Sequence, residues 1–191
     1  MKFFYIFFFF SFLTMAQELP FSTIPSVPKE YTATNSILRM IQGLGFRYYW
    51  ATEGLKAEDL KYQPTNDAKS TMETIKHLHG LSKTIYEAIS NKVSFRPILE
   101  MPEDFKSLRK ETLDQLNLAC LKLKSINDLE LEDLKITFDR GGGNQYNFPL
   151  WNLINGPIAD ALYHTGQVVS FRRTSGNPIS KGVNVFLGVK D

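Results

Sequence analysis

Asp160 and His164 stand four residues apart in a segment whose apolar pattern predicts a helix. At this spacing both side chains leave the same helix face one turn apart, so a carboxylate oxygen and an imidazole nitrogen can reach one metal ion. An inward-facing carboxylate needs a partner, and a cation, a hydrogen bond to His164 or an arginine would each provide one. The pair therefore predicts part of a metal site. The alternative is a histidine that is simply hydrogen-bonded in the core.

A third ligand is expected from an earlier segment. The chain contains three histidines, and the remaining two, His77 and His79, lie together on a second predicted helix. Residues two apart point about 200° away from each other around a helix, so both cannot face the same point. Both flank the apolar stripe, and the periodicity does not choose between them. The residues alone predict that one of the two completes the site.

Four amphipathic segments must position these side chains. Apolar residues recur at helical spacing in four ranges: 34–55, 70–89, 102–126 and 150–173. The second range opens with Ser70-Thr-Met-Glu73, which has the form of a capping box. In the fourth range Gly156-Pro157 predicts either a kink or the start of the helix's second part. The two arginines at its end, Arg172 and Arg173, are interpreted as a solvated helix end, with contact to an anionic substrate as the alternative.

A short hairpin is expected before the last helix. Residues 134–138 and 145–148 read as two strands, and the glycines at 141–143 lie in the turn between them. These glycines lack the helix start and the Lys-Ser/Thr pair of a phosphate-binding loop. The prediction is an all-α fold, an up-down four-helix bundle with a small β-hairpin before the last helix. Such bundles place metal sites between facing helices.

The N-terminus has the pattern of a secretory signal. Lys2 precedes an apolar run from Phe3 to Leu13, and small residues follow at Thr14 and Ala16. The run is shorter than the ~20 apolar residues of a comfortable membrane span. The prediction is a signal peptide over residues 1–16, cleaved after Ala16. An extended leader over 17–33 and one domain over 34–191 follow. The protein would then be exported to the periplasm or secreted, without a stable membrane anchor.

Charge and cysteine content restrict the partners. The formal net charge is +2, and the cations are scattered among acids, so no basic stripe indicates a nucleic-acid partner. Cys120 is the only cysteine, which excludes an internal disulfide. It stands among leucines and is expected to be a buried core residue rather than a reactive thiol. A small molecule is the expected partner, and the sequence leaves a homodimer open.

Two motifs resemble the DinB-like superfamily, whose members are metal-binding four-helix bundles. The stretch Ser70–His77 resembles the family's second-helix pattern, in which a Ser and a Glu precede a ligand His. The stretch Asp160–Gln167 resembles its last-helix pattern, usually His-x-x-x-His followed closely by Gly-Gln. The resemblance covers residues 34–178. It implies that His77, Asp160 and His164 are the ligands. Asp160 stands where the family usually has histidine.

The ligand set leaves the metal open among Zn, Ni, Fe and Mn. Three ligands leave at least one coordination position for water or substrate, as in catalytic zinc sites. We expect that position to open into a pocket between the second and fourth helices. The predicted function is metal-dependent hydrolysis of a small polar substrate. The alternatives are a non-catalytic metal- or small-ligand-binding bundle and a thiol-dependent transferase, an activity that the resemblance implies.

Overall fold

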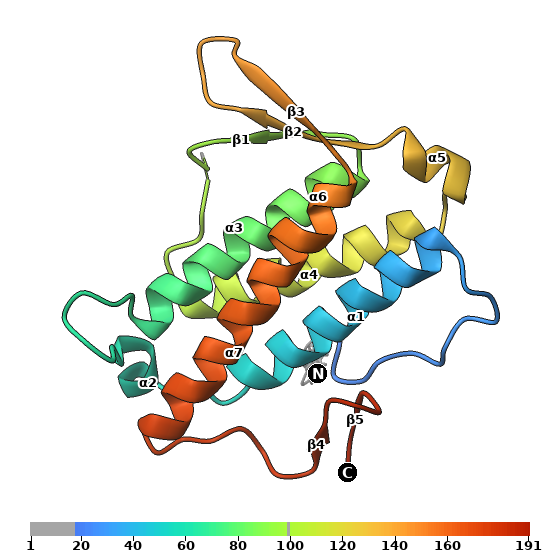
Figure 1. Ribbon diagram of the computed structural model, residues 1–191. Coiled ribbons are helices and arrows are strands. Elements are labelled where there is room, and N and C mark those ends of the chain that lie inside the picture. Colours follow the sequence, from blue (N-terminus) through green and yellow to red (C-terminus); the bar gives the residue numbers. More distant parts are fainter. Residues whose placement is uncertain (1–17, 99) are drawn as a thin grey trace, which may run out of the picture.

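The structure is a computed structural model that describes residues 18–98 and 100–191, and these are mostly helical with a small sheet (Figure 1). The predicted signal peptide and its cleavage point after Ala16 lie outside the described residues. None of the helices in the described part has the length and apolar composition needed to cross a bilayer.

Four long helices surround the main core. They are α1 (Ala33–Thr52), α3 (Thr71–Ile89), α4 (Phe105–Leu123) and α7 (Ala159–Thr174). Helix α1 packs against α4 and α7, and α3 also packs against both. The apolar stripes of all four meet in one cluster, which includes Leu44, Ile75, Ile85, Leu113 and Val168. Burying each such side chain stabilises the fold by about 1.5–3 kcal/mol.

The predicted helix starts are largely confirmed. The Ser70 hydroxyl accepts a hydrogen bond from the N–H of Glu73 at 3.2 Å, and the Glu73 carboxylate accepts one from the N–H of Ser70 at 2.8 Å. This is the capping box expected at the start of α3. Helix α1 begins one residue before the predicted range, and its N-cap is Thr32.

The last helix is interrupted at the expected place. A short helix α6 (Trp151–Leu153) leads into the π-helical turn η1 (Ile154–Ile158), and α7 follows directly. Gly156 has non-helical backbone angles, φ −96° and ψ −106°, immediately before Pro157. The kink predicted from Gly156-Pro157 is therefore confirmed. Two single-turn helices, α2 (Ala57–Lys61) and α5 (Asp128–Glu132), are too short to show a period in the sequence.

The predicted hairpin is present, and it carries a third strand. Strands β2 (Lys135–Asp139) and β3 (Gln145–Pro149) pair antiparallel. Strand β1 (Val93–Phe95) adds to β2 in parallel, in a segment that lies between two of the predicted helices. A three-residue strand offers no alternation that a sequence could reveal. Near the C-terminus β4 (Val183–Asn184) and β5 (Val189–Lys190) form a second, smaller hairpin.

The directions of the long helices correct the up-down prediction. His79 lies beside Thr112 and Ser82 beside Gln115, so α3 and α4 run parallel. An up-down bundle would have these consecutive helices antiparallel. The prediction was wrong because residues 90–104, which include β1, carry the chain back along the molecule before α4 begins (Figure 1).

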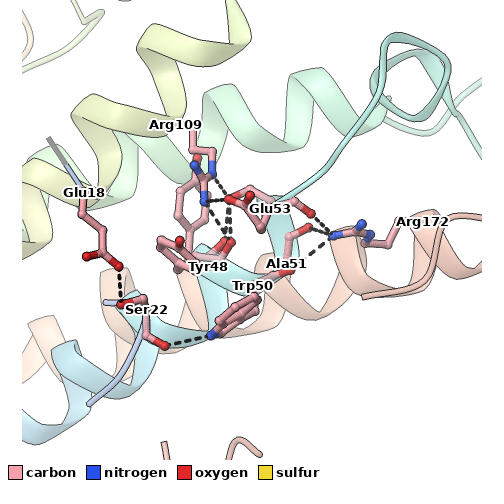
Figure 2. Close-up of polar contacts among 10 residues, drawn as sticks. Glu18, Ser22, Tyr48, Trp50, Ala51, Glu53, Arg109 and Arg172 are labelled. Atoms are coloured by element: carbon pink, nitrogen blue, oxygen red, sulfur yellow. Dashed lines mark hydrogen bonds and ion pairs between the residues drawn. The ribbon is translucent and has the colours of Figure 1, made fainter. Parts of the chain in front are cut away.

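A buried arginine joins the ends of α1 and α7. Arg172 is only 3% exposed, and its Nη1 donates to the carbonyls of Trp50, Ala51 and Glu53 at 3.2, 3.1 and 2.9 Å (Figure 2). The last carbonyls of a helix have no partner within the helix, and Arg172 satisfies them for α1. Because both C-terminal ends meet here, α1 and α7 also run parallel. Arg172 is therefore neither a solvated end nor an anion contact.

Asp59 closes the same cluster from α2. Its buried carboxylate accepts hydrogen bonds from Ser175 Oγ at 2.6 Å, Asn177 Nδ2 at 2.5 Å and the Lys56 N–H at 2.9 Å. Burial opposes ionisation of Asp59, but these hydrogen bonds outweigh it and hold its pKa below the ordinary value of 3.8. The cluster ties α2 and the chain after α7 to the end of α1.

We predict that Arg172→Ala lowers the free energy of unfolding by about 3 kcal/mol, since three helix-end carbonyls lose a charged donor. Its exposed neighbour provides the control: Arg173→Ala should stay within about 0.5 kcal/mol of the parent. Urea denaturation of both variants measures the difference. Equal values for the two would contradict the anchoring role.

Acid stability should depend on Asp59. A carboxyl whose folded pKa is lowered contributes stability above its unfolded pKa and loses it as the pH falls toward the folded value. We expect Asp59→Asn to be less stable than the parent at pH 7 and to lose less stability between pH 5 and pH 3. Denaturation midpoints across that range test this. Parallel pH profiles would show that Asp59 is not linked to folding.

Candidate metal centre

His77, Asp160 and His164 come together between α3 and α7. One carboxylate oxygen of Asp160 lies 3.2 Å from His77 Nε2, and the other lies 3.2 Å from His164 Nε2. The two imidazole rings are 4.5 Å apart between centroids and nearly perpendicular. One ligand atom from each residue lies within 4.8 Å of the others. The cluster could hold a single metal ion.

The local folding of α3 aims His77 at this point. The capping box fixes the first turn of the helix, and it also engages the carboxylate of Glu73, one turn before His77. Glu73 is thereby used for capping and is not part of the cluster. The Ser and Glu of the sequence motif consequently have a structural role that the hydrogen bonds show directly.

The kink before α7 sets the position of the other two ligands. The turn η1 ends at Ile158, and Asp160 is the second residue of the regular helix that follows. The non-helical backbone of Gly156 and the proline that follows it form a kink, and this kink sets the direction in which α7 presents its side chains. Asp160 and His164 then occupy adjacent turns of α7, as their spacing predicted.

Gln167 orients His164 from the next turn. His164 Nδ1 lies 2.6 Å from Gln167 Oε1, and a carbonyl oxygen can only accept, so Nδ1 carries the proton. The lone pair of Nε2 is then free on the side of Asp160. A hydrogen bond to the second nitrogen of a metal-binding histidine fixes its tautomer and ring orientation in many sites. Gln167, the last residue of the motif on α7, therefore contacts the ligand His164 directly.

The surroundings of His77 favour its neutral form. Burial lowers the pKa of His77 below its ordinary 6.5, and nearby His164 lowers it further, while the hydrogen bond to Asp160 acts in the opposite direction. Metal binding requires a neutral imidazole. Because its pKa is lowered, His77 is neutral over a wider pH range, and protons compete less with a metal ion for its nitrogen.

His79 belongs to the core rather than to the cluster. It is 1% exposed, and its Nδ1 lies 3.3 Å from the Thr112 hydroxyl on α4. Burial lowers the pKa of His79 to about 4, so the ring is neutral at pH 7. The structure thus separates the two histidines that periodicity left undecided, with His77 in the cluster and His79 turned toward α4.

The distances in the cluster fit a metal ion. Two atoms bound to one tetrahedral ion at about 2.1 Å lie about 3.4 Å apart, close to the 3.2 Å between Asp160 and each histidine. Two nitrogens and one oxygen also suit several transition metals. In the described part of the chain no fourth His, Cys, Asp or Glu joins the group.

The ligand cluster is exposed and lies apart from the large cavity of the molecule. The side chains of His77 and Asp160 are 33% and 42% exposed, so the cluster lies open at the surface. The large cavity formed by the described residues, about 1110 Å³, is instead lined by α1 and α7 and includes none of the three ligands. A pocket between α3 and α7 stays a prediction. Asp160 and His164 occupy one face of α7, whereas Leu162, Gly166 and Val169 face the cavity.

Cys120 plays no part in the site. It is buried on α4, as expected, and burial raises the pKa of its thiol to about 12. A thiol with this pKa is protonated at neutral pH and is a poor nucleophile or ligand.

No model of a known protein family matches the chain, and no curated protein does.

We predict one divalent metal per chain, lost on changing any of the three cluster residues. His77→Ala, Asp160→Asn and His164→Ala should each bind at least tenfold less metal, measured by elemental analysis after dialysis against zinc. The parent should also melt higher with zinc, because binding to the native state alone raises stability by about 2.7 kcal/mol at a hundred times Kd.

His79→Ala is the control for this prediction. It should keep the metal while losing stability through the cavity it leaves. Metal loss in His79→Ala with retention in His77→Ala would contradict the assignment. Unchanged metal content in all four variants would rule out the site.

Proposed function

We propose that the chain is a DinB-like four-helix bundle with a mononuclear divalent-metal site formed by His77, Asp160 and His164. Support comes from the four long helices around one core and from the two motifs on α3 and α7. The resemblance also provides the expectation that the third ligand is His77, and the geometry agrees with it. Export, which rests on residues 1–16, is proposed with it.

We further propose that the site hydrolyses a small polar substrate. The observation that carries this is the open three-donor cluster, with two imidazoles and one carboxylate at a surface that solvent reaches. A divalent ion in such a site lowers the pKa of a water molecule and polarises a carbonyl or phosphoryl oxygen. Because a fourth protein donor is missing from the described group, room remains for water and substrate.

The residues of the chain have distinct roles in this proposal. Asp160 contributes the negative charge and holds the two histidines at equal distance. Gln167 keeps the proton of His164 on Nδ1. Tyr163 borders the site, since its ring is 66% exposed and lies 5.2 Å from that of His164. An exposed aromatic face beside the ligands gives a substrate a surface on which to pack.

The two imidazoles and one carboxylate restrict the metal to a few transition-metal ions. Imidazole nitrogens suit Zn, Ni and Fe, and a carboxylate with two imidazoles also accepts Mn. Calcium and magnesium prefer all-oxygen sites. We therefore propose Zn, Ni, Fe or Mn as the metal.

A second candidate is a non-catalytic metal-binding bundle. It is favoured by one observation: the large cavity between α1 and α7 includes none of the three ligands, two of which are partly exposed. A substrate would have to bind on an open surface, where fewer contacts are available to hold it.

The two candidates differ in turnover. The zinc-, nickel- and manganese-loaded chains, and the iron-loaded chain kept anaerobic, would be tested on chromogenic esters, phosphoesters and amides. The hydrolase predicts turnover that chelation removes and that Asp160→Asn lacks, and His79→Ala should retain it if that variant is folded. A chain that binds one metal per molecule but hydrolyses none of these classes would support the non-catalytic candidate.

A further inference from the structure

We propose that the cavity between α1 and α7 is a second binding site, for an amphipathic anion with one compact acidic head group and an apolar body. This site is separate from the metal cluster and does not depend on the function proposed for it. The cavity has a volume of about 1110 Å³, slightly above the ~300–1,000 Å³ typical of small-molecule sites.

The floor of the cavity is formed by facing surfaces of two parallel helices. Gly43 of α1 and Gly166 of α7 both line it. A Cβ placed on Gly166 would meet nothing within 4 Å, so open space begins directly at the α7 backbone. Met40, Leu162 and Val169 supply apolar walls on either side. Such a floor suits an apolar chain that lies along the two helices.

Two chain segments complete the lining of the cavity beside this floor. One is the leader, with Val27, Pro28 and Tyr31, and the other is the C-terminal tail from Ile179 to Val185. They touch each other, because the N–H of Ile24 donates to the carbonyl of Gly188 at 2.8 Å.

The leader is also fastened to α1. The indole N–H of Trp50 donates to the Ser22 carbonyl at 3.1 Å (Figure 2). The buried ring of Phe21 occupies the space where a Cβ on Gly45 would stand, 2.6 Å from the nearest ring carbon. The leader is consequently a fixed part of the cavity lining.

The charged side chains that line the cavity indicate that the ligand is an anion. Arg39, Arg47 and Arg173 line the cavity, against one acid, Glu30. Arg39 and Arg47 are half-buried, yet they donate to the neutral carbonyls of Pro25 and Gly43. Within residues 18–98 and 100–191 none of the three arginines forms an ion pair with a carboxylate. Arginine is well suited to bind a carboxylate or phosphate through two parallel hydrogen bonds.

The apolar residues at the rim indicate the other half of the ligand. Val27 is 72% exposed, Val185 is 45% exposed, and Tyr31 is fully exposed, and all three line the cavity. Exposed apolar side chains around the mouth of a cavity are typical of a site that takes an apolar ligand. A lining that combines arginines with apolar residues matches a molecule with an acidic head and an apolar chain.

Laurate tests this proposal by isothermal titration on the full chain, with its N-terminus established by intact mass. We expect one laurate per chain at micromolar concentration, and much weaker binding of dodecanol, which lacks the charge, and of acetate, which lacks the chain. Arg47→Gln combined with Arg173→Gln should weaken laurate binding at least tenfold, since two charged hydrogen-bond donors are lost. Arg140→Gln, an exposed arginine in the β2–β3 turn, is the matched control and should bind as the parent does.

Two further variants locate the bound molecule. Gly166→Leu places a side chain in the open space of the cavity and should abolish binding, with circular dichroism confirming that the helices persist. Asp160→Asn disrupts the metal cluster on the opposite face of α7 and should leave laurate affinity unchanged. The proposal would be overturned if the parent did not bind laurate or bound dodecanol equally well. It would also be overturned if Arg140→Gln weakened laurate binding as much as the double arginine variant, if Gly166→Leu still bound laurate, or if Asp160→Asn lost laurate affinity.

Discussion

The fold depends on the buried guanidinium of Arg172. It satisfies the carbonyls at the end of α1 from a position near the end of α7, and this is possible only if the two helices run in the same direction. That direction decides what each face of α7 meets. One face presents Asp160 and His164 toward α3, and the other lies beside α1, the leader and the tail. The metal cluster and the cavity are therefore two consequences of one polar anchor.

Much of the helical core could be predicted from the sequence, and for identifiable reasons. The apolar period in α1, α3, α4 and α7 is strong, because each helix is long and has one face in a common core. The Ser70–Glu73 box and the Gly156-Pro157 kink are local signals that need no knowledge of distant residues. Short elements such as α2 and β1 have no period, and the fold places them through contacts with distant parts of the chain.

Only those features of the site that depend on spacing within one helix could be predicted from the sequence. The four-residue spacing of Asp160 and His164 predicts a shared face, and the structure has it. The choice of His77 over His79 depends on which side of α3 meets α7 and which meets α4, so it is fixed by tertiary packing. Gln167 was noticed in the sequence, but its partner, His164, is set by rotamers that no spacing encodes. The cavity was missed because part of its lining comes from two terminal segments with little regular structure.

The strand β1 has a consequence for the order of folding. It pairs in parallel with β2, and the whole of α4 lies between them in the chain. Contacts between residues distant in sequence pay a loop-closure entropy before they stabilise anything, so they form late. The hairpin β2–β3 can form from neighbouring residues, whereas β1 joins it only once α3 and α4 are packed side by side. The N–H of Arg96, directly after β1, donates to the Asp139 carbonyl of β2 at 2.7 Å. We expect the protection of this amide in hydrogen exchange to report on the packing of α3 against α4.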